Sequence, residues 1–186
     1  MKKIFSLTLF LLLVTGISGL AVAYVNGITY PVIAARLEEG MVRGYNELYP
    51  GADEYVDEGE QGRGSVIQQI IRAKIGGETV GVIYLVKPKG FAGDISMLVG
   101  FDLAGRVSTG IKILSQEETA GLGANCEQPW FTERFVGKTT ERELWVVKGE
   151  TEADDEVQAI TGATRTSEAV ANGVSAAAAD FASRFR

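Results

Sequence analysis

Histidine is absent from this chain of 186 residues, and Cys126 is its single cysteine. The lack of histidine excludes His-based metal sites, Ser-His-Asp and Cys-His nucleophile systems, and imidazole pH switches. A single cysteine excludes an intrachain disulfide, a zinc cluster and an iron–sulfur ligand set. We therefore expect no metal site and no catalytic residue set, and we expect any chemistry to belong to a cofactor.

Basic residues are also scarce. When Lys2 and Lys3 are set aside, 16 of the 18 Lys and Arg residues remain against 24 Asp and Glu residues, a net charge of −8. An acidic surface repels phosphate backbones, and no basic stripe interleaved with aromatic residues is present. The sequence therefore predicts that nucleic acid is not a partner.

The N-terminal segment has no charged side chain between Lys3 and Arg36. Residues 4–25 are almost continuously apolar and are long enough to cross ~30 Å of hydrocarbon as a helix. Lys2 and Lys3 favour a cytoplasmic N-terminus by the positive-inside rule. We predict a single-pass anchor over residues 1–25 in the lipid of the cell inner membrane, with the rest of the chain on the periplasmic side.

A cleaved secretory signal is the alternative interpretation of this segment. Ala21-Val22-Ala23 before Tyr24 fits the small-x-small pattern of a cleavage site. Against cleavage, the apolar run continues to Val25 and does not give way to a polar segment. Both interpretations place residues 36–186 outside the cytoplasm.

The rest of the chain is long enough for one domain, because a domain has ~100–200 residues. Apolar residues recur with helical spacing from Arg36 to Tyr49, and Pro50-Gly51 follows them. This pattern predicts a connecting helix within residues 26–50. The acidic, glycine-rich residues 51–64 that follow are predicted to form an exposed loop.

Two pairs of β-rich runs predict antiparallel hairpins, each strand of the second pair having one buried face. The first pair surrounds Gly76-Gly77 and the second surrounds Ala104-Gly105. A further strand and a C-terminal amphipathic helix are expected. The expected ranges are 66–75, 79–86, 93–101, 107–114 and 143–147 for strands and 168–181 for the helix. Residues 51–186 are therefore predicted to form a single α+β domain with flanking helices.

Two segments suggest ligand binding. Residues 116–123 follow a predicted strand and carry glycine at positions 121 and 123, which lets a flat ligand approach main-chain N–H groups. A simple turn would have the same composition. Residues 159–167 lead into the C-terminal helix and are rich in hydroxyls, which suit either a helix N-cap or an anion site at the helix start.

Together, and after an apolar N-terminal segment, these motifs resemble the G subunit of the Rnf (Rsx) ion-translocating electron-transport complex. They are similar, more distantly, to the C subunit of the Na+-translocating NADH:quinone reductase. Both families carry an FMN-binding domain. The resemblance rests on two runs of residues: Thr161, Gly162, Ala163, Thr164, Arg165, Thr166 and Ser167; and Glu118, Thr119, Ala120, Gly121, Leu122 and Gly123.

The resemblance implies that FMN is joined covalently to Thr164 by a phosphoester, through an external flavin transferase that uses FAD and Mg2+. The other residues of the two runs, Ala120 excepted, are implied to bind the cofactor. Arg165 would offset the phosphate charge, and Leu122 and Trp130 would cover the isoalloxazine ring.

The function implied is that of an electron-transfer subunit without complete enzymatic activity alone. Its partners would be the other membrane and redox subunits of an Rnf-type complex. Two other hypotheses stay open at this point. One is a membrane-anchored assembly or binding module without flavin, and the other is a free-standing extracytoplasmic flavin reductase.

Overall fold

The computed structural model describes residues 2–59, 66–103, 107–139 and 141–185. The chain divides into two compact units, residues 1–39 and residues 40–186. The turn expected at Ala104-Gly105 and the part of the acidic loop from residue 60 to 64 lie outside the described residues.

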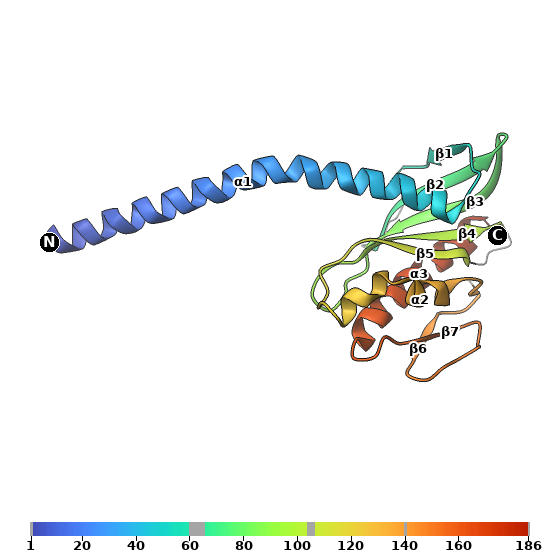
Figure 1. The fold of residues 1–186 in the computed structure, drawn as a ribbon. Coiled ribbons are helices and arrows are strands. Elements are labelled where there is room, and N and C mark those ends of the chain that lie inside the picture. The colour runs from blue at the N-terminus through green and yellow to red at the C-terminus, as the bar shows by residue number, and fades with distance from the viewer. Residues whose placement is uncertain (1, 60–65, 104–106, 140, 186) are drawn as a thin grey trace. The chain divides into compact units, whose positions relative to one another are not determined.

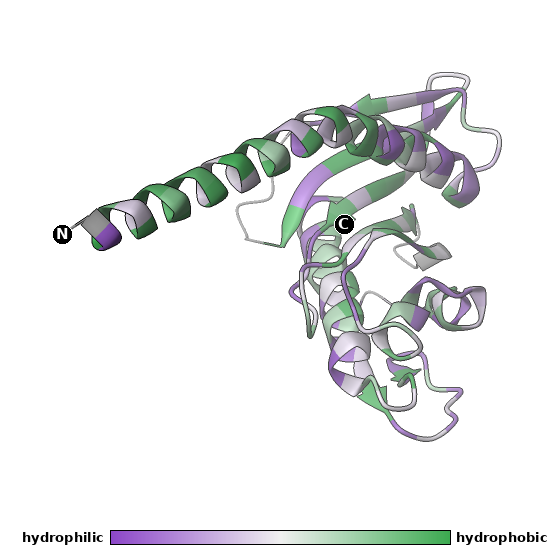
Figure 2. Ribbon diagram, turned by 60° about the vertical axis from the view of Figure 1, so that its left-hand side comes forward, coloured by the Kyte–Doolittle hydropathy of each residue, from purple (hydrophilic) through white to green (hydrophobic). Residues whose placement is uncertain are grey.

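The N-terminal helix α1 spans Lys2–Leu48 and contains Pro31. Its side chains from Lys3 to Glu39 are exposed, and the helix is long and apolar enough to cross a membrane. Figure 2 shows the hydrophobic colour along this helix and more hydrophilic colour near its C-terminal turns. The helix has no break at residue 25, so the division into an anchor and a connecting helix stays a prediction.

The second unit contains a five-stranded antiparallel sheet in the order β1-β2-β3-β4-β5 (Figure 1). The strands are β1 (Glu54–Asp57), β2 (Ile67–Ile75), β3 (Glu78–Val86), β4 (Ser96–Asp102) and β5 (Val107–Ser115). Both expected hairpins are therefore confirmed. Gly76 and Gly77 form the first turn with φ angles of 60° and 86°, which suit a two-residue hairpin connection.

The prediction of an exposed loop over residues 51–64 is wrong for Glu54–Asp57. This short segment pairs with β2, and Glu54 lies opposite Lys74 in the register. The first and the last of its four residues are acidic, so its composition indicated a loop and not a strand. Main-chain hydrogen bonding to the edge of the sheet decides its conformation.

The prediction of one buried face is wrong for β4, which is buried on both faces. Met97, Val99 and Phe101 belong to the larger core, whereas Leu98 packs in a second cluster with Leu48. The last turns of α1 cover this second face. Tyr49 lies over Gly81, where an added Cβ would collide with the tyrosine ring.

Helix α3 (Thr164–Phe185) covers the other face of the sheet. Its expected apolar side, with Val170, Val174, Ala178 and Phe181, is buried. At Gly173 an added Cβ would lie 2.5 Å from Met97 Cε and 2.9 Å from Pro88 Cγ. The helix therefore approaches β4 closely, and it begins at Thr164, before the expected residue 168.

Short elements lie between β5 and α3. They are the 3₁₀ helix η1 (Gly123–Glu127), α2 (Pro129–Thr132), the 3₁₀ helix η2 (Glu133–Phe135), β6 (Trp145–Val147) and β7 (Glu156–Gln158). The strand expected at 143–147 is confirmed as β6. It pairs in parallel with β7, which the sequence did not predict because its three residues form no pattern. Phe131 and Phe135 anchor α2 and η2 in the core.

Cys126 gives a direct test of this core. Its side chain is fully buried. Burial is the main cause that raises the pKa of the thiol to about 12, and the negative charges of Glu127 and Glu118 add to it. We expect the folded protein to react with a thiol reagent such as DTNB only after denaturation, because the thiolate is the reactive form. A stoichiometric reaction at pH 8 without denaturant would contradict this packing.

Candidate functional site

A cavity of about 420 Å³ lies where three segments of the second unit meet. These segments are the turn after β3, the loop after β5 and the start of α3. The lining residues are Phe91, Glu118, Thr119, Leu122, Gly123, Gly162, Ala163, Thr164, Arg165 and Thr166. The structure thus brings together the two segments that the sequence singled out, although more than 30 residues separate them in the chain.

Of the residues in the two runs that were predicted to bind the cofactor, all but three line this cavity. Gly121 lies in the same loop but outside the lining, and its φ of 77° explains the glycine. Thr161 is exposed outside the lining. Ser167 is fully buried, where its hydroxyl accepts a hydrogen bond from Ile160 N and donates one to Ala163 O.

Thr164 differs from the other hydroxyl residues at the start of α3. It is the first residue of the helix, it is half-buried and it lines the cavity. Within the described part of the chain its hydroxyl has no hydrogen-bond partner, whereas the Thr166 hydroxyl donates to Glu118 at 2.5 Å. Thr164 therefore offers a side-chain oxygen that the fold leaves available.

The main chain just before α3 is shaped by Gly162, which has a φ of 78°. A Cβ at this position would be strained and would lie 3.0 Å from Leu122 Cδ2. Leu122 is 43% exposed and brings an apolar surface against the helix start. Arg165 is exposed beside Thr164, so a guanidinium also faces solvent at this rim.

Glu118 is a buried carboxylate, 8% exposed, in the wall of the cavity. It accepts hydrogen bonds from the Thr166 hydroxyl and from the main-chain N–H of Ala92 at 2.9 Å, and the nearby main-chain N–H groups of Phe91 and Gly93 also favour its charged form. Burial alone would raise its pKa, but these hydrogen bonds outweigh that effect and the pKa lies below its usual value. Glu118 is therefore a stable buried anion.

Gly123 is required by this carboxylate. An added Cβ would lie 2.6 Å from Thr166 Oγ1 and 2.7 Å from Glu118 Oε2. Both distances are shorter than real Cβ contacts, so a side chain here would disrupt the hydrogen bond between the two residues. Gly123 was expected to let a ligand approach the main chain. In the structure, its missing side chain leaves space for the Glu118 carboxylate.

Sequence reasoning missed Phe91. This residue lines the cavity and is 66% exposed, in a turn that belongs to neither of the two singled-out segments. Trp130, which was expected to cover a flavin ring, is not in the cavity lining. It packs against the guanidinium of Arg134, 5.0 Å from the ring centroid.

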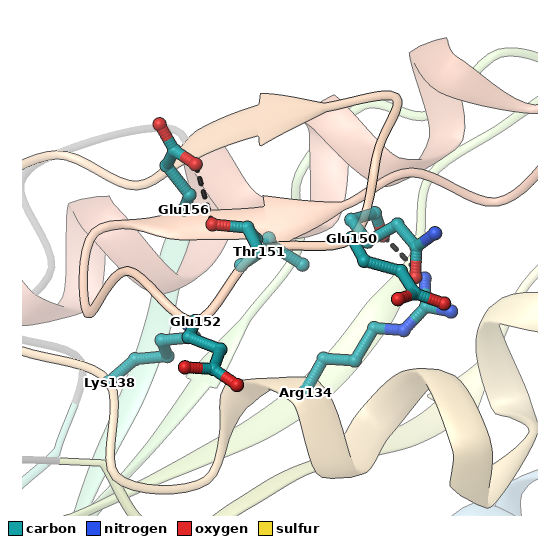
Figure 3. A pocket seen from close by; sticks show the side chains of 8 residues that line it. Arg134, Lys138, Glu150, Thr151, Glu152 and Glu156 are labelled. Atoms are coloured by element: carbon teal, nitrogen blue, oxygen red, sulfur yellow. Dashed lines mark hydrogen bonds between the residues drawn. The ribbon is translucent and has the colours of Figure 1, made fainter.

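A second cavity, of about 480 Å³, lies beside β7 (Figure 3). The two basic side chains of its lining donate hydrogen bonds to main-chain carbonyls. Arg134 donates to Gln158 O at 2.6 Å, and Lys138 donates to Ala153 O at 2.5 Å. These bonds hold the chain around β7 in place. Among the described residues, no group of three or more Cys, Asp and Glu side chains is arranged to hold a metal ion.

The first cavity has the chemistry that a flavin phosphate requires. Thr164, Arg165 and the free N–H groups at the start of α3 suit a phosphate, because the positive end of the helix dipole favours anions. Phe91, Leu122 and Ala163 supply an apolar wall for an aromatic ring. The residues present therefore fit FMN.

Comparisons with known proteins agree with this geometry. The FMN-binding domain family matches residues 90–179, which include all three segments of the cavity. The G subunit of the Na(+)-translocating ferredoxin:NAD(+) oxidoreductase complex of Acetobacterium woodii is 33% identical, with 93% of this chain and 89% of that protein covered. The G subunit of the proton-translocating ferredoxin:NAD(+) oxidoreductase complex of Clostridium ljungdahlii has the same identity and coverage.

Among solved structures, the C subunit of the Na(+)-translocating NADH-quinone reductase from Parabacteroides distasonis shares the fold. The TM-score is 0.61 at 19% identity, with 82% of this chain and 94% of that chain covered.

The hydrogen bonds of Glu118 predict a pH-dependent contribution to stability. Since its folded pKa is lowered, the contribution is present above the unfolded value of about 4.3 and is lost as pH falls through the folded pKa. We expect Glu118→Gln to lower the free energy of unfolding by about 1–3 kcal/mol at pH 7, and by less at acid pH.

Urea unfolding between pH 3 and pH 7 measures both effects. Glu117→Gln is the matched control, because Glu117 is a neighbouring carboxylate outside the core. Equal pH profiles for the two variants would contradict the assignment of Glu118 as a stabilising buried anion.

Proposed function

This chain belongs to the family of G subunits of ion-translocating oxidoreductase complexes, and we propose that it carries FMN covalently on Thr164. The chain is an electron-transfer subunit with an FMN-binding domain. The other subunits of an Rnf-type complex are its partners. In our proposal this subunit would relay electrons between neighbouring redox subunits of that complex, with FMN held on Thr164.

The observation that carries the proposal is the environment of Thr164. Thr164 lines the cavity, and its hydroxyl has no hydrogen-bond partner among the described residues. Thr166 and Ser167 use their hydroxyls in buried hydrogen bonds, and Thr161 lies outside the cavity. This difference supports Thr164 over its neighbours on grounds that do not depend on a motif.

The surroundings of Thr164 suit the phosphodiester that the linkage would leave. This group keeps one negative charge, which the start of α3 stabilises. Arg165 adds a guanidinium that can form charge-assisted hydrogen bonds with phosphate oxygens. The cavity of about 420 Å³ would then hold the ring end of the cofactor against Phe91 and Leu122.

Attachment requires a separate catalyst. A threonine hydroxyl does not displace phosphate unaided, and this chain has no histidine that could activate it. We assign that step to a flavin transferase that uses FAD and Mg2+. The Thr164 Oγ–P bond forms, the pyrophosphate bond of FAD breaks, AMP leaves, and the hydroxyl proton passes to the transferase or to solvent.

The bound FMN supplies the reversible uptake and release of electrons. This chain contributes attachment, a polar rim for the phosphate and an apolar wall for the ring. A covalent bond also suits a domain outside the cytoplasm, where free FMN would be lost by dilution. We place the domain on the periplasmic side of the inner membrane, with α1 as its anchor in lipid and the N-terminus in the cytoplasm.

Co-expression with a flavin transferase tests the linkage. The intact mass should increase by one FMN less one water, and Thr164→Val should abolish this increase. Thr161→Val is the matched control and should keep the adduct. An adduct mapped to Thr161, Thr166 or Ser167 would contradict the assignment.

Thr164→Val should otherwise remain folded. Thr164 is half-buried and makes no side-chain hydrogen bond among the described residues, so we expect a change of at most about 0.5 kcal/mol in the flavin-free protein. Thermal unfolding followed by circular dichroism measures this change. A variant that aggregates would show that Thr164 has a role in the core.

Topology is tested by reporters fused after Arg186. Lys2 and Lys3 precede a charge-free apolar segment, so we expect a fused alkaline phosphatase to be active and a fused cytoplasmic reporter to be inactive. Retention in the membrane after alkaline carbonate extraction would support the anchor. An N-terminal sequence that begins at Tyr24 would show a cleaved signal instead.

A further inference from the structure

Phe91 is unusual among the residues that line the cavity. It is a large aromatic side chain, 66% exposed, at the rim of a space that also contains Thr164 and Leu122. Phe91 and Leu122 thus give the lining two exposed apolar side chains, and exposed apolar surface beside a cavity is typical of a binding site. The cavity of about 420 Å³ also lies within the range of small-molecule sites.

The turn that carries Phe91 has a defined conformation. Gly90 N donates to Gly93 O at 2.7 Å, and Ile95 N donates to Pro88 O at 2.9 Å. The main chains of Lys89 and Asp94 pair as a single antiparallel β-bridge. At Gly90 an added Cβ would collide with Glu118 Oε1. The main chain on either side of Phe91 thus lies against the buried carboxylate, at Gly90 and at Ala92, whose N–H donates to it.

Glu118 links this turn to the start of α3. One carboxylate oxygen accepts from Ala92 N at 2.9 Å, and the other accepts from the Thr166 hydroxyl at 2.5 Å. Thr166 is two residues after Thr164, the proposed attachment point. The same side chain therefore fixes the distance between the turn that carries Phe91 and the end of the cavity where the phosphate would be held.

We infer that Phe91 packs against the isoalloxazine ring of the flavin on Thr164, and that Glu118 is the positioning residue that holds Phe91 in place. This inference rests on the proposed function. Aromatic rings attract one another in offset or edge-to-face arrangements, and an exposed phenyl group loses unfavourable contact with water when it is covered. The structure assigns to Phe91 the role that the sequence had suggested for Trp130, whose ring packs on Arg134.

The test uses the full chain, flavinylated by co-expression with a transferase, and compares Phe91→Ala with Trp130→Ala. Both residues are exposed aromatics, at 66% and 46%, but only Phe91 lines the cavity. The flavin content by intact mass, the quenching of flavin fluorescence by iodide and the flavin reduction potential are measured for each protein.

We expect Phe91→Ala to keep full flavin content, because attachment occurs at the phosphate. Loss of one aromatic contact should lower the equilibrium constant between the covered and the uncovered ring about 2- to 10-fold, the equivalent of about 0.4–1.4 kcal/mol. Iodide quenching should increase accordingly and the reduction potential should shift. Trp130→Ala should match the parent in all three measurements, and Phe91→Tyr should restore the parental values.

Glu118→Gln tests the positioning role. If Glu118 acts through Phe91, this variant should increase iodide quenching in the parent background and add little in the Phe91→Ala background. Independent, additive increases would overturn the positioning role. Parental quenching and potential in Phe91→Ala would overturn the contact, and so would loss of flavin from Phe91→Ala alone. A parent protein without flavin would instead refute the proposed function.

Discussion

The buried carboxylate of Glu118 holds the candidate cofactor site together. A buried charge is costly unless hydrogen bonds replace its hydration, and here the donors come from the Phe91 turn and from α3. The carboxylate itself belongs to the loop after β5, so one side chain joins all three walls of the cavity. Its requirements also explain two glycines, since a side chain at Gly90 or Gly123 would occupy the space of the carboxylate or its partner.

The rest of the domain provides a rigid base for this arrangement. Helix α3 lies on one face of the sheet and the last turns of α1 lie on the other, so β4 is buried on both sides. Close packing at Gly173 fixes α3 against Met97 and Pro88. The start of α3, and with it Thr164, is thereby held at a constant position relative to the turn that follows Pro88. A cofactor attached there would meet the same surroundings in every molecule, which a defined reduction potential requires.

The site illustrates which signals a sequence can carry. The Thr-Gly-Ala-Thr run and the Gly-Leu-Gly loop are short, contiguous and recognisable, and most of their residues line the cavity. Phe91 has no comparable signal, because a phenylalanine close to glycines in a turn also fits an ordinary hairpin connection. Trp130 lies next to another aromatic residue in the sequence, which made it the more obvious candidate. In the structure its ring packs against Phe131 and Arg134 instead. Similarly, Thr166 and Ser167 share the motif with Thr164, and only their burial and their hydrogen bonds distinguish them from it.

The sequence by itself determined the fold class, the N-terminal apolar helix, the central hairpins and the two segments of the site, because hydrophobic periodicity and turn glycines act over a few neighbouring residues. The sequence also shows that the chain contains no histidine. Only the tertiary structure decided that β1 and β7 are strands, that β4 is buried on both faces and that Glu118 bonds to Thr166. These features depend on partners distant in the chain, and no local pattern records which distant donor will meet a buried carboxylate.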